Sequence, residues 1–230
     1  MTYQKAVTFS YDDGITQDKR LVQIFNQYGM KATFNLNTGI QTEESCFEID
    51  GQPVCRMNQE DIGDLYQGHE IAVHGLTHAA PKEMTEEEMD VEFGEDIANI
   101  TRLYGEKPVG MAYAYGAYDD SSVDYLRRHG IQYGRTVEAT HAFTLPENPL
   151  LLKATCHHND EQLFALAEKF LAAEPKPGEN MLFYIWGHSY EFYVNDNWQR
   201  METLCRMLAG RGDILYGTNR QCLSYFRVIQ

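Results

Sequence analysis

Two short segments of the chain contain residue types that can bind a metal ion. Asp12 and Asp13 follow one apolar run, and His74 and His78 follow another. Two neutral imidazoles and one carboxylate suit zinc and similar divalent ions, and such a set leaves coordination positions open for water. Because adjacent carboxylates at a strand end point in different directions, one can bind the metal while the other accepts a proton. The Asp12-Asp13-Gly14 turn is equally compatible with an ordinary turn or helix cap.

Three further histidines also follow apolar runs later in the chain. His188 is a candidate general acid, and Glu191 could orient it or raise its pKa. The alternatives are a packing role for His188 and a solvated surface charge for Glu191. His157 and His158 either line a pocket or mark the exit of a strand into a helix cap.

The elements that must position these residues alternate between strand and helix. Strands are expected at 6–11, 32–36, 70–73, 109–114, 132–137, 151–156, 181–186 and 213–216. Helices are expected at 16–28, 58–67, 85–104, 120–129, 160–173, 197–208 and 219–226. About seven strand–helix units in one chain favour a (β/α) barrel or a doubly wound parallel sheet. A hairpin with its turn at Asp50-Gly51 is expected within 39–57.

The polar candidates cluster at the carboxyl ends of the expected strands. Tyr113 and Tyr115 end the fourth strand, Arg135 lies in the fifth, and Trp186 ends the seventh. The carboxyl ends of the strands of a parallel α/β barrel meet on one face, where active sites are built. The sequence therefore predicts one site at this face.

Composition limits the partners. The 230 residues carry 19 Lys and Arg against 34 Asp and Glu, a net charge of 19 − 34 = −15. Because nucleic acid and anionic membranes attract basic surfaces, neither is expected as a partner. No apolar run reaches the roughly 18–20 residues of a membrane helix, and the N-terminus does not resemble a signal peptide. We therefore expect a cytoplasmic chain.

The five cysteines have no CxxC spacing, so neither a disulfide framework nor a Cys-rich zinc site is expected. Cys46 and Cys55 flank the expected hairpin and could meet across it. A reduced chain is the expectation.

Residues 8–14 (TFSYDDG) and 68–78 (GHEIAVHGLTH) resemble the first two motifs of the polysaccharide deacetylase family, the NodB-type homology domain. The resemblance covers nearly the whole chain. It implies a single catalytic domain over 1–230 with the distorted (β/α) barrel of that family. It also implies a hydrolase that removes N- or O-acetyl groups from carbohydrates with a bound divalent metal. Zinc is the expected ion, with Co²⁺, Mn²⁺ and Ni²⁺ as alternatives.

The resemblance also implies roles for individual residues. Asp13, His74 and His78 would bind the metal, Asp12 would act as the base, and His188 would act as the acid.

The third motif departs from the family pattern. The family sequence is Arg-x-Pro-Tyr, whereas 112–116 (AYAYG) keeps Tyr and Gly but lacks Arg and Pro. Tyr115 could still contribute its backbone N–H to an oxyanion hole. We hypothesise that Arg135 supplies the missing charge beside the base, the alternative being an ordinary surface arginine. Glu191 is the expected substitute for the Asp that the family pairs with its late His.

Other side chains near these strand ends are candidate substrate contacts: Tyr113, His157, His158, Trp186 and Glu191. The departures from the family pattern suggest a divergent branch whose substrate need not be a long polymer. The expected partner is a carbohydrate or a small amide, and the sequence leaves the oligomeric state open. Two alternatives stay open: a hydrolase of a small non-sugar amide on the same fold, and a catalytically decayed carbohydrate-binding module.

Overall fold

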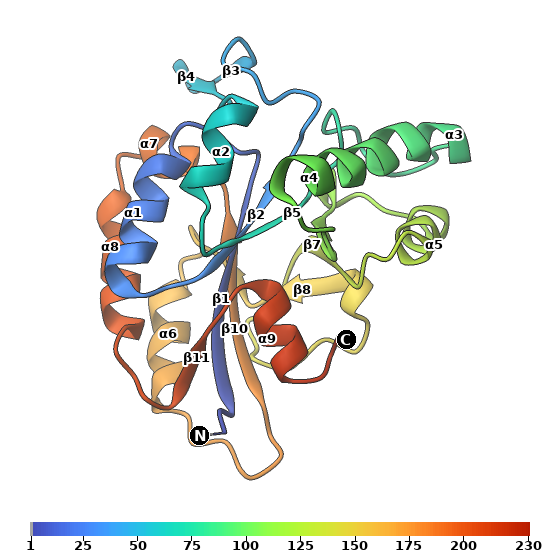
Figure 1. The fold of residues 1–230 in the computed structure, drawn as a ribbon. Helices are drawn as coiled ribbons and strands as arrows, with labels where there is room; N and C mark the ends of the chain where they lie inside the picture. The colour runs from blue at the N-terminus through green and yellow to red at the C-terminus, as the bar shows by residue number, and fades with distance from the viewer. Residues whose placement is uncertain (1) are drawn as a thin grey trace.

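The computed structural model describes residues 2–230. Its main sheet has nine parallel strands, and most neighbouring strands follow one another in the chain. The strands are β1 (Lys5–Asp12), β2 (Ala32–Leu36), β5 (Glu70–Val73), β6 (Gly110–Ala112), β7 (Tyr133–Ala139), β8 (Leu152–Ala154), β9 (Cys156–His157), β10 (Met181–Gly187) and β11 (Ile214–Tyr216). The two long central strands, β1 and β10, run upward in Figure 1, so their carboxyl ends lie in the upper part of the picture.

The sheet curls back on itself because its two edge strands are consecutive in the chain. β8 pairs with β7 and β9 pairs with β10, and only Thr155 separates β8 from β9. The N–H of Thr155 donates to the carbonyl of Tyr184 in β10, at 2.8 Å. When β11 is set aside and β8 and β9 are counted as one position, the remaining eight strands occupy seven positions. This arrangement confirms the predicted distorted (β/α) barrel with about seven strand–helix units.

β1 is the central strand of the sheet. It pairs with β10 along most of its length, with β2 over its second half, and with β11 over its first three residues. All eight of its residues are buried. A strand covered on both faces reads as a nearly continuous apolar run, which explains the sequence pattern before Asp12.

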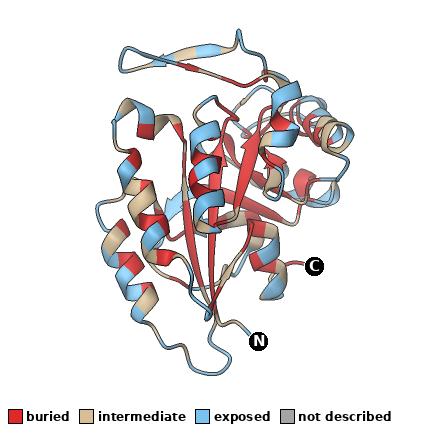
Figure 2. Cartoon of the chain, turned by 60° about the vertical axis from the view of Figure 1, so that its left-hand side comes forward, coloured by how far each residue is buried: buried red, intermediate tan, exposed pale blue. Residues whose placement is uncertain are grey.

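Helices cover the outside of the sheet (Figures 1 and 2). The α-helices are α1 (Asp18–Tyr28), α2 (Gln59–Leu65), α3 (Glu86–Met89), α4 (Asp96–Tyr104), α5 (Asp120–Arg128), α6 (Leu163–Ala172), α7 (Tyr190–Val194), α8 (Trp198–Leu208) and α9 (Asn219–Tyr225). α1, α6 and α8 pack on one side through a large apolar core, while α3, α4 and α5 lie on the other. Two 3₁₀ segments, Ala114–Gly116 and Pro149–Leu151, complete the helical elements together with the π-helix described next.

The helix predicted at 85–104 is interrupted. Its N-terminal capping box is present: the Thr85 side chain accepts from the Glu88 N–H, and the Glu88 carboxylate accepts from the Thr85 N–H. After one turn, however, the chain widens into a π-helix over Asp90–Glu95 before α4 resumes. The π-helix has a physical use, because the carbonyl of Glu92 accepts a hydrogen bond from the N–H of Leu76 at 2.7 Å.

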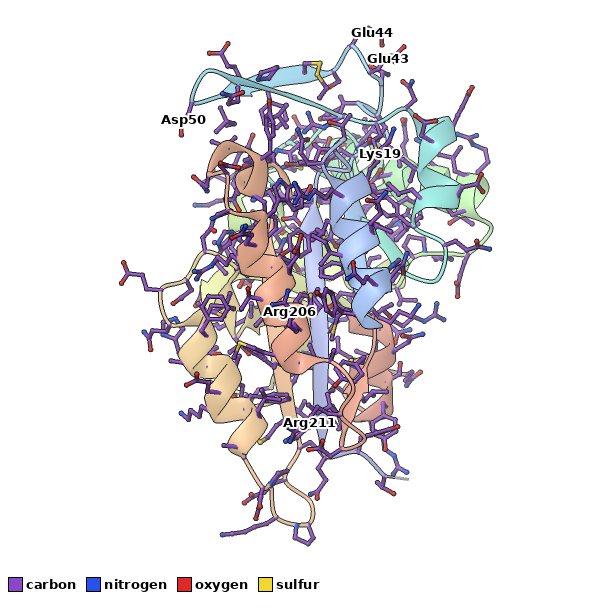
Figure 3. The ribbon with its side chains drawn as sticks, turned by 90° about the vertical axis from the view of Figure 1, so that its left-hand side faces the viewer. Lys19, Glu43, Glu44, Asp50, Arg206 and Arg211 are labelled. Atoms are coloured by element: carbon purple, nitrogen blue, oxygen red, sulfur yellow. A yellow bond between two sulfur atoms is a disulfide. The ribbon has the colours of Figure 1, made fainter. Side chains whose placement is uncertain are left out.

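The predicted hairpin forms above the barrel from β3 (Cys46–Ile49) and β4 (Gln52–Cys55) (Figure 2). Cys46 and Cys55 face each other in its register and are joined by a disulfide, seen as the yellow bond in Figure 3. The expectation of a reduced chain was therefore wrong, because the hairpin register brings these two sulfurs together. Cys156, Cys205 and Cys222 are free and buried. Within residues 2–230, no helix combines the length and the apolar character of a membrane span.

One buried carboxyl group makes the stability of the fold depend on pH. Asp18 is fully buried at the start of α1, where the hydroxyls of Ser189 and Tyr66 donate to it. Burial raises its pKa from 3.8 to about 7, although these hydrogen bonds oppose the change. The folded state therefore holds the proton more tightly than the unfolded state. The resulting stabilisation is complete below pH 3.8 and is lost as the pH rises to about 7.

We predict that Asp18→Asn removes this dependence. The free energy of unfolding of the variant relative to the wild type should rise by up to roughly 4 kcal/mol between pH 4 and pH 8. Urea unfolding of both proteins at the two pH values measures the difference. An equal effect of the substitution at pH 4 and pH 8 would contradict the assignment.

Candidate active site

A cavity of about 500 Å³ opens at the carboxyl ends of the strands. Eight residues predicted from the sequence line it: Asp12, Asp13, His74, His78, Tyr113, Tyr115, Trp186 and His188. They come from β1, β10 and the segments that follow β1, β5, β6 and β10. The fold therefore brings together side chains separated by more than 170 positions in the sequence.

Asp13, His74 and His78 form a compact group of metal-ligand atoms. The Nε2 atoms of His78 and His74 lie 3.7 and 4.0 Å from Oδ1 of Asp13. The Nδ1 atom of His74 lies 2.8 Å from the carbonyl oxygen of Ala112. Because a carbonyl only accepts, Nδ1 carries the proton and Nε2 presents its lone pair toward the cavity.

The three residues fit a divalent metal ion. Their ligand atoms all lie within 4.8 Å of one another. The Nε2 atom of His74 is buried and has no hydrogen-bond partner among the described residues. Since buried polar atoms rarely stay unpaired, this nitrogen points to a ligand that the polypeptide does not supply. One carboxylate and two imidazoles form a donor set typical of catalytic zinc.

Three residues of the site adopt left-handed backbone conformations, which favour glycine and are uncommon for other residues. Asp13, His78 and Tyr115 have φ of 81°, 64° and 59°. Such conformations each cost about 1–3 kcal/mol and persist only where the surroundings impose them. The Asp13 N–H donates to the carbonyl of Asn35 at 3.0 Å, and the Asp13 carbonyl accepts from Gln41 Nε2 at 2.6 Å.

Buried polar residues that the sequence did not reveal hold the histidine loop. The carboxylate of Glu92 accepts from the N–H and hydroxyl of Thr77 and from the N–H of Ala79, at 2.8–3.1 Å. Asp96 accepts from the N–H of His74 at 3.3 Å, and Asn37 donates to the His74 carbonyl at 2.8 Å. One sequence signal could have revealed them. Glu92 and Asp96 lie four residues apart and therefore share one face of the expected helix, so two carboxylates on its buried face would have indicated a polar contact there.

Asp12 is paired with a buried arginine. Arg135 is fully buried in β7, and its guanidinium donates to Oδ2 of Asp12. Asn35 donates to the other carboxylate oxygen at 2.8 Å. Burial alone would raise the pKa of Asp12, but Arg135, with help from His74, lowers it from 3.8 to about 2. The burial of Arg135 excludes the alternative of an ordinary surface arginine.

His188 lines the same cavity as the metal-ligand group. Its Nε2 is 3.8 Å from Oδ2 of Asp12, and its Nδ1 is 3.8 Å from Glu191. Burial alone would lower the pKa of His188, but Glu191, Asp12 and Asp13 raise it from 6.5 to about 9. His188 is therefore protonated at neutral pH.

Glu191 is itself held by two other histidines. Its Oε2 atom is 3.1 Å from Nε2 of His157 and 2.9 Å from Nε2 of His158. The N–H of Asn159 donates to Nδ1 of His157, so the proton of that neutral ring lies on Nε2 and leaves no lone pair there for a metal. This proton position favours a hydrogen-bonded cluster around Glu191 rather than a second metal site.

Four of the predicted substrate contacts do not present a free polar group to the cavity. His158 is fully buried, stacked between Tyr11 and Phe192, so the expectation that it meets substrate was wrong. His157 and Glu191 do not line the cavity. Tyr113 lines it, but its hydroxyl donates to the carbonyl of Leu150 at 2.9 Å.

The other two aromatic residues predicted for the site border the cavity. Tyr115 is 70% exposed, and its ring lies 4.6 Å from that of His78. Trp186 covers the guanidinium of Arg135, whose carbon lies 4.3 Å from the ring centroid.

Comparison with known proteins identifies the family. The sequence model described as polysaccharide deacetylase matches residues 1–134, which is more than half of the chain. The chain therefore belongs to the polysaccharide deacetylase family, as the two motifs predicted. The matched part contains Asp12, Asp13, His74 and His78, whereas Arg135 and His188 lie beyond it. No curated protein sequence matches the chain.

Solved structures share the fold at low sequence identity. A candidate polysaccharide deacetylase from Mycobacterium smegmatis superposes with a TM-score of 0.68 and 14% identity, covering 99% of this chain and 92% of that one. A family 4 acetyl xylan esterase from Clostridium thermocellum, solved with a cobalt ion, gives 0.62 and 14%, covering 96% and 91%. The match to Streptococcus pyogenes deacetylase PplD is partial: it covers 56% of this chain and 55% of that one, with 18% identity and a TM-score of 0.49.

We predict that Glu92→Ala weakens zinc binding by about 10–100-fold, because the loop that carries His78 loses three hydrogen bonds. Competition titration with a chromogenic chelator measures the affinity, and circular dichroism checks that the variant is folded. Glu95→Ala, at an exposed position of the same π-helix, is the matched control. Equal zinc affinities in the folded variant and the wild type would exclude this role for Glu92.

Proposed function

We propose that the chain is a metal-dependent hydrolase that removes N- or O-acetyl groups from a carbohydrate. The single observation that carries the proposal is the group formed by Asp13, His74 and His78 at the wall of a cavity that also contains Asp12 and His188. Family membership supports the same reaction class. Zinc is the proposed ion, with Co²⁺, Mn²⁺ and Ni²⁺ as alternatives, and the donor set of one carboxylate and two imidazoles supports this choice.

Each residue of the candidate site has a proposed role in the reaction. A divalent ion held by Asp13, His74 and His78 would polarise the acetyl carbonyl and lower the pKa of water. Asp12 accepts the proton of the attacking water, and Arg135 holds its carboxylate in place and ionised. His188 donates a proton to the leaving nitrogen or oxygen.

The backbone N–H of Tyr115 is the proposed donor to the oxyanion that develops on the acetyl group. Tyr115 lies beside His78 at the mouth of the cavity, which supports this assignment. Its left-handed backbone conformation also marks it as a position fixed by its surroundings rather than by its own preference.

The protonation states support the assignment of acid and base. The pKa of Asp12 is about 2 and that of His188 is about 9, so at neutral pH the proposed base is ionised and the proposed acid is protonated. Two titratable groups whose surroundings push their pKa values apart are typical of a general acid–base pair.

The cavity suits a small ring-shaped substrate. Its size is that of a site for a small molecule. Aromatic rings of Phe47, Tyr115, Trp186 and Tyr190 line it, and such surfaces pack against the apolar face of a sugar. The same size also fits a small non-sugar amide, which stays the second candidate. The presence of Asp12, Asp13, His74, His78 and His188 in one cavity weighs against a decayed binding module.

The proposed cytoplasmic location stays an expectation. The disulfide between Cys46 and Cys55 weighs against it, because disulfides persist mainly in oxidising compartments.

Substitution of the two adjacent aspartates separates metal binding from turnover. We predict that Asp13→Asn reduces the zinc content to near zero, whereas Asp12→Asn keeps zinc and loses acetate release. Asparagine tolerates the left-handed backbone of position 13, so Asp13→Asn does not require a new turn. Metal analysis of both purified proteins, with acetate release from acetylated chito-oligosaccharides, is the measurement. Full zinc occupancy in Asp13→Asn would rule out the ligand assignment.

Substitution of Glu191 should change the pH profile of kcat. Because Glu191 raises the pKa of His188, Glu191→Gln should lower the pKa of the alkaline limb of kcat. It should also reduce kcat by about tenfold or more, because His188 loses its orientation. Glu161→Gln, at an exposed position, serves as the control. A uniform loss of kcat with an unchanged pH profile would indicate a merely structural role.

A further inference from the structure

Arg56 lies in the cavity, although no sequence motif pointed to it. It directly follows β4 of the hairpin, and its N–H donates to the carbonyl of Ser45 at 3.0 Å. An isolated bridge to Ile15 ties this segment to the turn that carries Asp13. Arg56 is only 8% exposed, yet its side chain forms part of the cavity lining.

The guanidinium of Arg56 is poorly satisfied by the polypeptide. Its single hydrogen bond within residues 2–230 runs from Nη2 to Oδ1 of Asp13, at a long 3.4 Å. The Nε atom is buried and has no hydrogen-bond partner in that part of the chain. A guanidinium carries five N–H donors, so most of those of Arg56 stay free. A buried charge with this few partners destabilises the fold unless something else pairs with it.

Arg135, the other buried arginine that pairs with an aspartate of this site, provides the contrast. Its donors reach Asp12, Ser10 and the carbonyl of Thr136, and the ring of Trp186 covers its flat face. Arg135 is therefore a satisfied structural cation. Arg56 instead faces Asp13, whose carboxylate the metal-ligand group also uses. The two arginines thus differ in what they leave available to a substrate.

We propose that Arg56 binds a carboxylate of the substrate, so that the hydrolase acts on acetylated sugars or amines that carry a carboxyl group near the acetyl group. This inference rests on the proposed function. A planar guanidinium matches a carboxylate through two parallel hydrogen bonds. A monoanion also fits better than a phosphate dianion, because Asp12 and Asp13 border the same cavity and repel additional negative charge.

The hairpin positions Arg56 for the proposed recognition of a carboxylate. The disulfide between Cys46 and Cys55 closes the hairpin immediately before Arg56. Phe47, from β3, lies under the guanidinium at 5.3 Å and against the ring of Tyr190 at 5.7 Å. Arg56 is thereby held in the cavity by an element that lies outside the barrel strands.

A matched pair of ligands tests the proposal. N-acetylmuramic acid differs from N-acetylglucosamine by a lactyl ether that carries one carboxylate. We expect the metal-depleted wild-type chain to bind N-acetylmuramic acid about tenfold or more tighter by isothermal titration calorimetry. Arg56→Gln should abolish this preference, and Arg56→Lys should restore part of it. Arg211→Gln, an exposed arginine at the opposite end of the molecule in Figure 3, should preserve the preference.

Assays of the same ligands with the zinc-loaded chain distinguish the proposed role of Arg56 from the proposed hydrolase activity. Arg56→Gln should raise KM for N-acetylmuramic acid about tenfold more than KM for N-acetylglucosamine, with a smaller change in kcat. Equal binding of both ligands by the wild type, or tighter binding of N-acetylglucosamine 6-phosphate, would overturn the carboxylate assignment. Absence of acetate release from every ligand, with the binding preference intact, would reject the proposed function and leave the Arg56 site standing.

Discussion

The buried ion pair between Asp12 and Arg135 is the interaction on which the catalytic end of the barrel depends. Asp12 ends β1 and Arg135 lies in β7, and several strands separate β1 from β7 in either direction around the sheet. The pair therefore crosses the inside of the barrel. Both side chains are almost completely buried, so removal of Arg135 would leave Asp12 as an uncompensated buried charge, which is strongly destabilising, whereas asparagine at position 12 can still accept a hydrogen bond from the guanidinium.

This pair fixes the metal-ligand group as well as the proposed base. Asp13 is the next residue after Asp12, and its strained backbone is held by Asn35, which also donates to the Asp12 carboxylate. On the other side of the group, Asp96 and Glu92 hold the segment from His74 to Ala79. Buried polar contacts, and not secondary structure alone, therefore determine where the ligand atoms of the site lie.

The sequence predicted the barrel and the side chains that its strand ends bring together. Alternating strands and helices define the order of the sheet, and the carboxyl ends of parallel strands must lie on one face. The first two motifs pointed to Asp12, Asp13, His74 and His78, and the position of Arg135 in the next strand pointed to its pairing with Asp12.

The remaining features depend on structure that a linear pattern does not encode. Glu92 reaches the histidine loop from a π-helix, a local irregularity without a sequence signature. Arg56 contacts Asp13 from 43 residues away, through a hairpin whose position relative to the barrel is set by tertiary contacts. The sequence allowed Cys46 and Cys55 to meet across the hairpin, but the spacing of the five cysteines favoured a reduced chain; the hairpin register decides the pairing. His157 and His158 both contact Glu191, yet only His158 is fully buried, and the spacing of two adjacent histidines does not reveal this difference.

The central claim is that Asp13, His74 and His78 bind the metal ion. Diffraction from crystals of the zinc-loaded chain, recorded on both sides of the zinc absorption edge, tests this claim most directly. We predict one anomalous peak, bounded by Oδ1 of Asp13 and the Nε2 atoms of His74 and His78. A peak beside Glu191, His157 and His158 instead, or no ordered zinc at either cluster, would contradict it.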